Sequence, residues 1–305
     1  FRALHNNGYS YQDINNGNFF INPENGDVLI CDNDNVSPFG TNLGIMGKQR
    51  WMAPEIVMGK NDPDKNSDRF SLAVVLFRLL FINHPLEGRY STPPCMTKEA
   101  EQKYYGSAPI FVYDPSTTEN RPIPGTDHNL KLFWNVYPDY VKEAFIRAFS
   151  HDVMMKQKPR ILEKEWMDIF IRLRTEIGRC PYCGQETFYT FKGSHDIPCM
   201  ECGKKIPITN ALQIKNQILP IFPGLKISLW TVDSSLEDIR TQVAEVVKNP
   251  KDPKLLGFRN LSQRTWSINL PDGSQRPLPP QQVVPVRAGF EIHFLGGTND
   301  SGIIK

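Results

Sequence analysis

Asp13, Asn18 and Asp32 have the types and spacing that would place a base beside a divalent cation. The Asn18 amide and the Asp32 carboxylate both offer the hard oxygen ligands that such cations prefer. Asp13 lies five residues before Asn18, on the segment that leads into it. Its carboxylate would stand beside the cation and accept a proton from a reacting group.

Four cysteines form a second candidate site, in two C-x2-C pairs separated by fifteen residues. Paired thiolates at this spacing are typical of a zinc ribbon, and a Gly after each pair, Gly184 and Gly203, allows a tight turn around the metal. Four thiolates leave no open coordination position, so a structural Zn²⁺ is expected. The alternative is two disulfides, which a reducing compartment disfavours. The expected ligands are Cys180, Cys183, Cys199 and Cys202.

A β-hairpin would position the first site. The apolar runs 19–21 and 28–31 flank a segment dense in turn residues, Asn22-Pro23-Glu24-Asn25-Gly26-Asp27. If Ile21 pairs near Val28, the antiparallel register brings Asn18 and Asp32 together at the open end. The cation site is therefore expected where the two strands separate.

These residues resemble the catalytic loop of protein kinases. The spacing Asp13-x-x-x-x-Asn18, followed by Asp32 after a short hairpin, is similar to the family's catalytic loop and magnesium-binding Asp. Residues 47–55, GKQRWMAPE, resemble its Gly-Thr-Pro-x-Tyr-x-Ala-Pro-Glu element, and residues 68–73 resemble the start of its buried central helix. The resemblance covers roughly the first 175 residues.

A late segment completes the resemblance. Lys158-Pro159-Arg160 is similar to the stretch whose Arg pairs with the Ala-Pro-Glu glutamate, which implies a buried ion pair between Arg160 and Glu55. In this reading Asp13 accepts the proton of the substrate hydroxyl, while Asn18 and Asp32 hold the Mg²⁺ that bridges the ATP phosphates.

The sequence departs from the family pattern in three places. Asn15 stands where Ser/Thr kinases usually have a phosphate-contacting Lys, Asp34 where the Gly of Asp-Phe-Gly is expected, and Tyr11-Gln12 replaces His-Arg. Lys48 occupies the position of the Thr that lies beside the transferred phosphate. We expect its ammonium to replace the missing catalytic-loop charge, with Arg50 as a competing source.

The resemblance implies a multidomain α+β protein. The predicted parts are a mostly helical protein-kinase C-lobe at 1–176, a four-cysteine zinc ribbon at 177–206 and an antiparallel β-sandwich-like module at 207–305. Residues 68–82 are apolar on nearly every face and predict a buried helix, whereas 90–129 should be a mostly irregular insertion. Two amphipathic helices are expected around 141–149 and 162–173. Predicted strands are Lys226–Trp230, Val243–Val247, Leu255–Phe258, Thr265–Asn269, Gln282–Val286 and Glu291–Phe294, with a helix over Ser235–Lys248 as an alternative.

Residues 286–297 near the end of the last module, VRAGFEIHFLGG, resemble forkhead-associated domains without their phosphothreonine-binding residues. A structural docking role is therefore favoured over specific phosphopeptide binding.

The function implied is ATP-dependent phosphoryl transfer to Ser/Thr of a protein substrate, by a bacterial-type kinase. The sequence lacks a Gly-rich loop and a Val-Ala-Ile-Lys strand, so it is expected to contain no N-lobe and to be inactive alone. The alternative is a pseudokinase scaffold that organises partners through the ribbon and the β-module. Implied partners are a protein substrate and, by resemblance, a cognate phosphatase and a von Willebrand-type domain protein.

Composition argues against two other classes of partner. The chain has 305 residues, 40% of them hydrophobic, and a formal charge of +2, which is too small to predict binding to nucleic acid or an anionic membrane. The longest apolar run, 72–82, is interrupted by Arg78 and is shorter than the ~20 residues of a membrane span. The sequence begins without a secretion signal, so a cytoplasmic location is expected.

Overall fold

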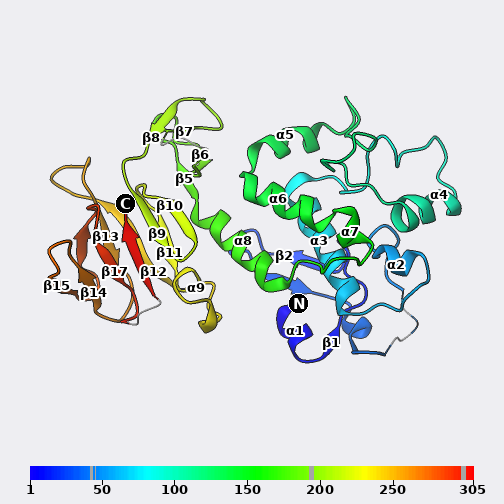
Figure 1. The fold of residues 1–305 in the computed structure, drawn as a ribbon, viewed down its shortest axis with the longest axis horizontal. Helices are drawn as coiled ribbons and strands as arrows, with labels where there is room; N and C mark the ends of the chain where they lie inside the picture. Colours follow the sequence, from blue (N-terminus) through cyan, green and yellow to red (C-terminus); the bar gives the residue numbers. More distant parts are fainter. Residues whose placement is uncertain (42–43, 45, 192–195, 297–299) are drawn as a thin grey trace. The chain divides into compact units, whose positions relative to one another are not determined.

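The computed structural model describes residues 1–41, 44, 46–191, 196–296 and 300–305. The chain divides into two compact units, Phe1–Trp166 and Met167–Lys305. Helices predominate in the first unit, drawn from blue to green in Figure 1, and strands in the second, drawn from green to red. The predicted boundaries at residues 176 and 206 stay predictions.

The first unit contains two short antiparallel strand pairs and most of the helices. β1 pairs with β4, and β2 pairs with β3 in the predicted register, Ile21 opposite Val28. The elements are α1 (Arg2–Asn6), β1 (Tyr9–Ser10), β2 (Phe19–Ile21), β3 (Val28–Ile30), the 3₁₀ turn η1 (Asn33–Asn35), β4 (Ser37–Pro38), α2 (Pro54–Val57), α3 (Lys65–Phe81), α4 (Lys98–Gln102), the π-helix η2 (Lys103–Ser107), α5 (His128–Val136), α6 (Asp139–Ala148) and α7 (His151–Met154). Helix α8 (Glu163–Thr175) begins in this unit and continues past its boundary at Trp166.

Helix α3 is the centre of this unit, as the sequence predicted. Asp64 caps its first turn by accepting hydrogen bonds from the Asn66 and Ser67 amides, and the Ser67 hydroxyl closes the capping box. The buried apolar side chains of α3 are Phe70, Ala73, Val74, Phe77 and Phe81. Phe77 packs edge-on against Phe145 of α6. Because α3 is packed in the core, the side chains at its N-terminal end have fixed positions.

The insertion at 90–129 is more ordered than predicted. It contains α4 and η2, and the beginning of α5. The buried Asn120 amide donates to the carbonyls of Leu86 and Ile110, which ties the irregular part to the end of α3. Buried side chain to backbone bonds of this kind leave no periodic pattern in a sequence, and α4 is too short to show one.

The second unit is built from strand pairs and two larger antiparallel sheets. β5 (Ile177–Arg179) pairs with β6 (Glu186–Phe188), and β7 (Asp196–Pro198) with β8 (Lys205–Pro207). A six-stranded sheet has the order β10 (Gln217–Pro220), β9 (Ala211–Ile214), β18 (Ser301–Ile304), β17 (Glu291–His293), β14 (Trp266–Asn269), β15 (Gln275–Leu278). A four-stranded sheet has the order β11 (Lys226–Ser228), β12 (Gln242–Lys248), β13 (Leu256–Asn260), β16 (Val283–Pro285). The helical turns α9 (Leu229–Val232) and η3 (Ser234–Leu236) follow β11.

Both sheets contribute to one apolar core that also contains side chains of the cysteine hairpins. Tyr189, after β6, stacks on Phe222 with ring centroids 3.9 Å apart.

The alternative of a helix over Ser235–Lys248 is wrong, because β12 occupies Gln242–Lys248 and pairs on both sides. Strands β9, β10, β15 and β18 were not predicted; each has only four residues, too few to show alternation clearly.

Among the residues that the structure describes, no helix is both long enough and apolar enough to span a bilayer.

Candidate functional site

The Asp13 carboxylate is held from two sides. Its Oδ1 accepts a hydrogen bond from the Lys48 main-chain amide at 2.9 Å, and its Oδ2 accepts one from Asn18 Nδ2 at 3.2 Å. Gly47 permits the first contact because its backbone has φ +92°, and a Cβ there would lie 3.1 Å from the Gln12 carbonyl oxygen. The geometry orients one carboxylate at the surface of the unit, which suits a general base.

The loop around Asp13 is stiffened by amide side chains. The Asn18 amide also donates to the Asp13 carbonyl at 3.0 Å. Asn15, which is buried, donates to the same carbonyl at 3.1 Å and accepts from the Gly17 amide at 2.9 Å. The Asn15 side chain thus braces the backbone of the loop.

Asp32 lies where the hairpin opens. The Cys31 amide donates to the Asn18 carbonyl at 2.9 Å, one residue beyond the β2–β3 pairs, so Asn18 and Asp32 lie at the same end of the hairpin. Asp32 is exposed and takes a left-handed backbone conformation, φ 58°, ahead of η1. An exposed carboxylate and an amide at the same end of the hairpin both offer oxygen atoms of the kind that Mg²⁺ prefers.

Lys48 approaches the loop in a different way from the one expected. Its main-chain amide contacts Asp13, while its ammonium donates to Asn16 Oδ1 at 3.4 Å. The ammonium therefore contacts the 13–18 loop at Asn16, two residues before the Asn18 that contacts Asp13. Its role in phosphoryl transfer stays a prediction.

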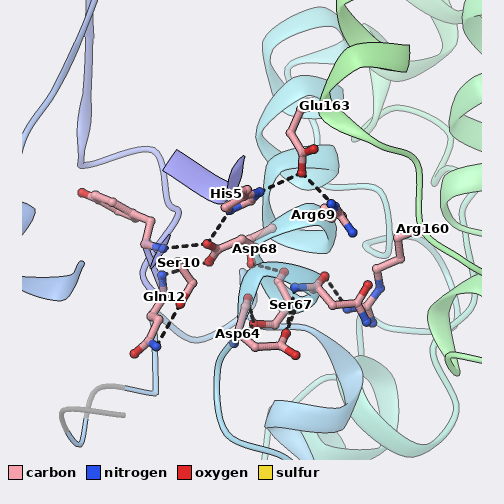
Figure 2. Close-up of polar contacts among 12 residues, drawn as sticks. His5, Ser10, Gln12, Asp64, Ser67, Asp68, Arg69, Arg160 and Glu163 are labelled. Carbon is pink, nitrogen blue, oxygen red and sulfur yellow. Dashed lines mark hydrogen bonds and ion pairs between the residues drawn. The ribbon is translucent and has the colours of Figure 1, made fainter. Parts of the chain in front are cut away.

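Asp68, in the first turn of α3, fixes the backbone that leads into Asp13 (Figure 2). Its Oδ2 accepts from the Tyr11 amide at 2.7 Å and its Oδ1 from the Gln12 amide at 2.9 Å. Gln12 has φ +70°, a conformation that a non-glycine residue adopts only when its surroundings impose it. The buried Tyr11 ring adds a second anchor through its hydroxyl, which donates to the Cys31 carbonyl. Burial raises the pKa of Tyr11 to about 12, so the hydroxyl remains a neutral donor.

The predicted ion pair between Glu55 and Arg160 is confirmed. The guanidinium donates to the two carboxylate oxygens at 2.8 and 2.7 Å, and to the Asn66 carbonyl at 2.8 Å (Figure 2). Both charges are buried, so the fork geometry and the third hydrogen bond compensate for their lost hydration. This pair anchors the end of the 47–55 segment to α3.

A cavity of about 230 Å³ lies beside the same segment. It is lined by Gln49, Arg50, Met52, Val57, Lys98, Glu101, Gln102 and Tyr105. Arg50 contacts the Glu87 carboxylate at 3.3 Å, and Tyr105 donates to the same carboxylate at 3.0 Å. The 47–55 segment is thereby attached to the π-helix as well as to α3.

The four cysteines come together as predicted. Their Sγ atoms all lie within 4.8 Å of one another, with 3.8 Å from Cys180 to Cys202 and 3.7 Å from Cys183 to Cys199. Four thiolates around Zn²⁺ at about 2.3 Å would be about 3.8 Å apart, whereas a disulfide needs about 2.05 Å. The donor set therefore fits a tetrahedral metal ion. Gly184 and Gly203 have φ +75° and +69°, which accommodates the tight turns expected after each pair.

No sequence pattern indicated that the buried side chains of His5 and Glu163 would interact. His5 and Glu163 lie 158 positions apart and are joined by a hydrogen bond of 2.8 Å. A histidine before the loop and a glutamate at a helix start are individually ordinary, so only a fold that brings α1 to α8 reveals their pairing.

A match to a known protein family lies within the first unit. The family described as protein kinase domain matches residues 1–123. Mitogen-activated protein kinase kinase kinase 3 of Arabidopsis thaliana is 32% identical over 79 residues, which is 25% of this chain and 13% of that protein. Methionine--tRNA ligase of Nanoarchaeum equitans (strain Kin4-M) is 27% identical over 84 residues, which is 28% of this chain and 10% of that protein. The chain thus spans about a tenth of the length of these relatives. The stretch that carries Asp13, Asn18, Asp32 and Lys48 matches a protein kinase domain.

Proposed function

We propose that the protein transfers the γ-phosphoryl group of ATP to Ser or Thr of a protein substrate. The observation that carries the proposal is the Asp13 carboxylate, held by the Lys48 amide and by Asn18 at the open end of the β2–β3 hairpin. Asp13 would orient the substrate hydroxyl and accept its proton. Asn18 and Asp32 would hold Mg²⁺, which supplies charge neutralisation of the phosphates when bound.

The test is incubation of the full-length protein with labelled ATP, Mg²⁺ and a library of Ser/Thr peptides. Asp13→Asn keeps the size of the side chain and removes the base, so it should reduce transfer by about 10²-fold or more. Transfer that is equal in the wild type and in Asp13→Asn would exclude this assignment of the base.

Lys48 is proposed as the cation beside the transferred phosphate, because its ammonium lies on the catalytic loop near Asn16. Lys48→Ala should lower the transfer rate by about 10²-fold, as for other electrostatic contacts to a transition state. Arg50→Ala is the matched control, since Arg50 is engaged with Glu87. Unchanged turnover in Lys48→Ala would dispose of this role.

A pseudokinase scaffold is the alternative. It is favoured by Asp34 in place of the expected Gly and by Asn15, whose side chain is used to brace the loop. A scaffold would show no transfer in any variant and would retain partner binding in Asp13→Asn. A cognate phosphatase and a von Willebrand-type domain protein are proposed as partners on resemblance alone.

We also propose that Cys180, Cys183, Cys199 and Cys202 hold one structural Zn²⁺, because the separations of their sulfur atoms match a closed tetrahedral site.

A further inference from the structure

His5 lies between two carboxylates from different helices (Figure 2). Its Nε2 is 3.0 Å from Asp68 Oδ2, in the first turn of α3, and its Nδ1 is 2.8 Å from Glu163 Oε1, at the start of α8. All three side chains are almost entirely excluded from solvent. The imidazole therefore connects the two helices.

The hydrogen-bond pattern defines the protonation state of the ring. A carboxylate can only accept hydrogen bonds, and a neutral imidazole has a single N–H to donate. Because both ring nitrogens face carboxylate oxygens at hydrogen-bond distance, both must carry a proton. The geometry is that of an imidazolium with charge-assisted bonds at either end.

The surrounding charges fit a cationic ring. Arg69 of α3 donates from Nε to the same Glu163 oxygen at 2.8 Å, so this carboxylate stays ionised between two cations. The pocket thus contains two carboxylates opposite the imidazolium and the guanidinium.

Asp68 extends this link to the reacting groups. The Oδ2 atom that faces His5 also accepts from the Tyr11 amide, and Oδ1 accepts from the Gln12 amide, directly before Asp13. Gln12 has the positive φ noted above, so its conformation depends on such bonds. A change in the position or charge of Asp68 would therefore alter the backbone position of Asp13.

We propose that Glu163 is a positioning residue for the catalytic loop and acts through His5: it holds the protonated imidazole against Asp68, and Asp68 in turn fixes the strained backbone before Asp13. This inference rests on the proposed phosphoryl transfer for its effect on rate, but not for its effect on the loop. Three side chains in contact, Glu163, His5 and Asp68, thus connect the start of α8 to the loop.

The titration of these groups agrees with the geometry. Burial alone would lower the pKa of His5, but hydrogen bonds to Asp68 and Glu163 outweigh it and raise the pKa above 6.5. Burial would raise the pKa of Glu163, yet its bonds from His5 and Arg69 hold it at about 2. The contribution of the His5 contacts is fully present below pH 6.5 and is lost as the pH rises through the raised folded-state pKa.

Nuclear magnetic resonance of the full chain, with ¹⁵N-labelled histidine and glutamine, tests the link directly. We expect both His5 ring nitrogens to be protonated at pH 7 and the Gln12 amide to shift with the same midpoint as His5. Glu163→Gln should lower that common midpoint by about one pH unit or more, the usual effect of removing an adjacent opposite charge. Glu165→Gln is the matched control, because Glu165 lies on the same helix in an exposed pair with Arg147.

Phosphoryl transfer gives the second readout. In Glu163→Gln the basic limb of the kcat profile should move to lower pH, with KM unaltered. At pH values well above both midpoints, kcat should be about tenfold lower per unit of midpoint change. Glu165→Gln should follow the wild type. A purely structural role of Glu163 would lower stability without moving this limb.

Each outcome decides one of the two proposals. If the wild type transfers no phosphate, the proposed function fails, and the shared midpoint of His5 and Gln12 still tests the link. A neutral His5 ring at pH 7, or a Gln12 amide that ignores the His5 titration, overturns the link, as does a His5 midpoint unchanged by Glu163→Gln. If Glu163→Gln does not fold, the wild-type titration together with His5→Gln, in which the Gln12 amide transition should vanish, decides it.

Discussion

The two candidate sites are assembled over very different distances along the chain. The cysteine cluster draws its ligands from residues 180–202, and the turns after each pair close locally through bonds such as Gly184 N to Cys180 O at 2.9 Å. The loop that carries Asp13, in contrast, depends on partners from Lys48 to Glu163. The first site is a property of short segments, and the second is a property of the folded unit.

The two sites should therefore respond to different perturbations. Removing the metal should dismantle the cysteine cluster because thiolates have little reason to stay together without it. The loop that carries Asp13 has no such single support. Asp68 binds the backbone amides before Asp13, His5 contacts Asp68, and the Lys48 amide and Asn18 hold the Asp13 carboxylate. Four perturbations, ordered by expected effect, test the contrast.

Metal removal should have the largest effect. Structural Zn²⁺ sites contribute apparent free energies of about 10–16 kcal/mol in small domains. Because Cys180 and Cys199 belong to the apolar core shared with the two sheets, a strong chelator should also weaken strands outside the ribbon. Metal analysis should find about one equivalent per chain, and hydrogen exchange should become faster in β9 and β10 after chelation. A folded, metal-free protein with unchanged exchange would contradict this, and Cys95→Ser, an exposed cysteine, serves as control.

Arg160→Ala should rank second. It leaves the buried Glu55 carboxylate with only the Lys156 ammonium, 4.0 Å away, at a cost of up to about 3–5 kcal/mol in the free energy of unfolding of the first unit. Exchange of α3 amides measures the loss. Arg147→Ala breaks an exposed pair with Glu165 and should cost about 1 kcal/mol or less. Equal losses in the two variants would show that the ion pair is not a principal support.

Gly178→Ala tests the packing between the cysteine hairpins and the sheets. A Cβ at this position would lie 2.5 Å from Phe222 Cε2 and 2.7 Å from Tyr189 Cε2, where the two rings stack. Overpacking of this kind costs about 1–3 kcal/mol. Thermal unfolding of the second unit measures it, beside Gln185→Ala, whose side chain is exposed in the same hairpin. Wild-type stability in Gly178→Ala would mean that the hairpin and the sheets are independent.

The smallest effect at neutral pH is expected from titration of His84. Its Nε2 donates to the Arg50 carbonyl at 2.8 Å and its Nδ1 accepts from the Leu86 amide at 3.1 Å, a pattern that requires the neutral ring. Burial lowers the pKa of His84 to about 4, so the unfolded state binds the proton first on acidification. The free energy of unfolding of the first unit should therefore fall as the pH decreases from 6.5 through about 4.

Urea denaturation at pH 7 and pH 5 measures this loss, and His84→Gln should remove most of the difference between the two pH values. His5, held between carboxylates, contributes in the opposite sense, and the two histidines can be separated by measuring His5→Gln under the same conditions. A pH dependence retained in His84→Gln would assign the acid sensitivity elsewhere.

Prediction from sequence worked where the signal was local and periodic. The β2–β3 register followed from two short apolar runs around a turn, and α3 from a stretch apolar on every face. The Glu55–Arg160 pair was predicted from the resemblance to protein kinases, and the structure confirms it. The alternative of a helix over 235–248 was wrong, because the apolar residues of this segment lie in β12, which pairs with a neighbouring strand on each side.

The cysteine cluster could be predicted from the sequence, because each C-x2-C turn is a local motif that brings two thiolates together and the spacing of the two pairs is typical of one metal site. The sequence also determined the order of Asp13, Asn18 and Asp32 around one hairpin. Only the tertiary structure decided that the Lys48 amide, rather than its ammonium, contacts Asp13, and that Glu163 reaches the catalytic loop through His5. The physical reason is that hydrogen bonds between residues far apart in the chain carry no periodicity, so they exist only once the helices have packed.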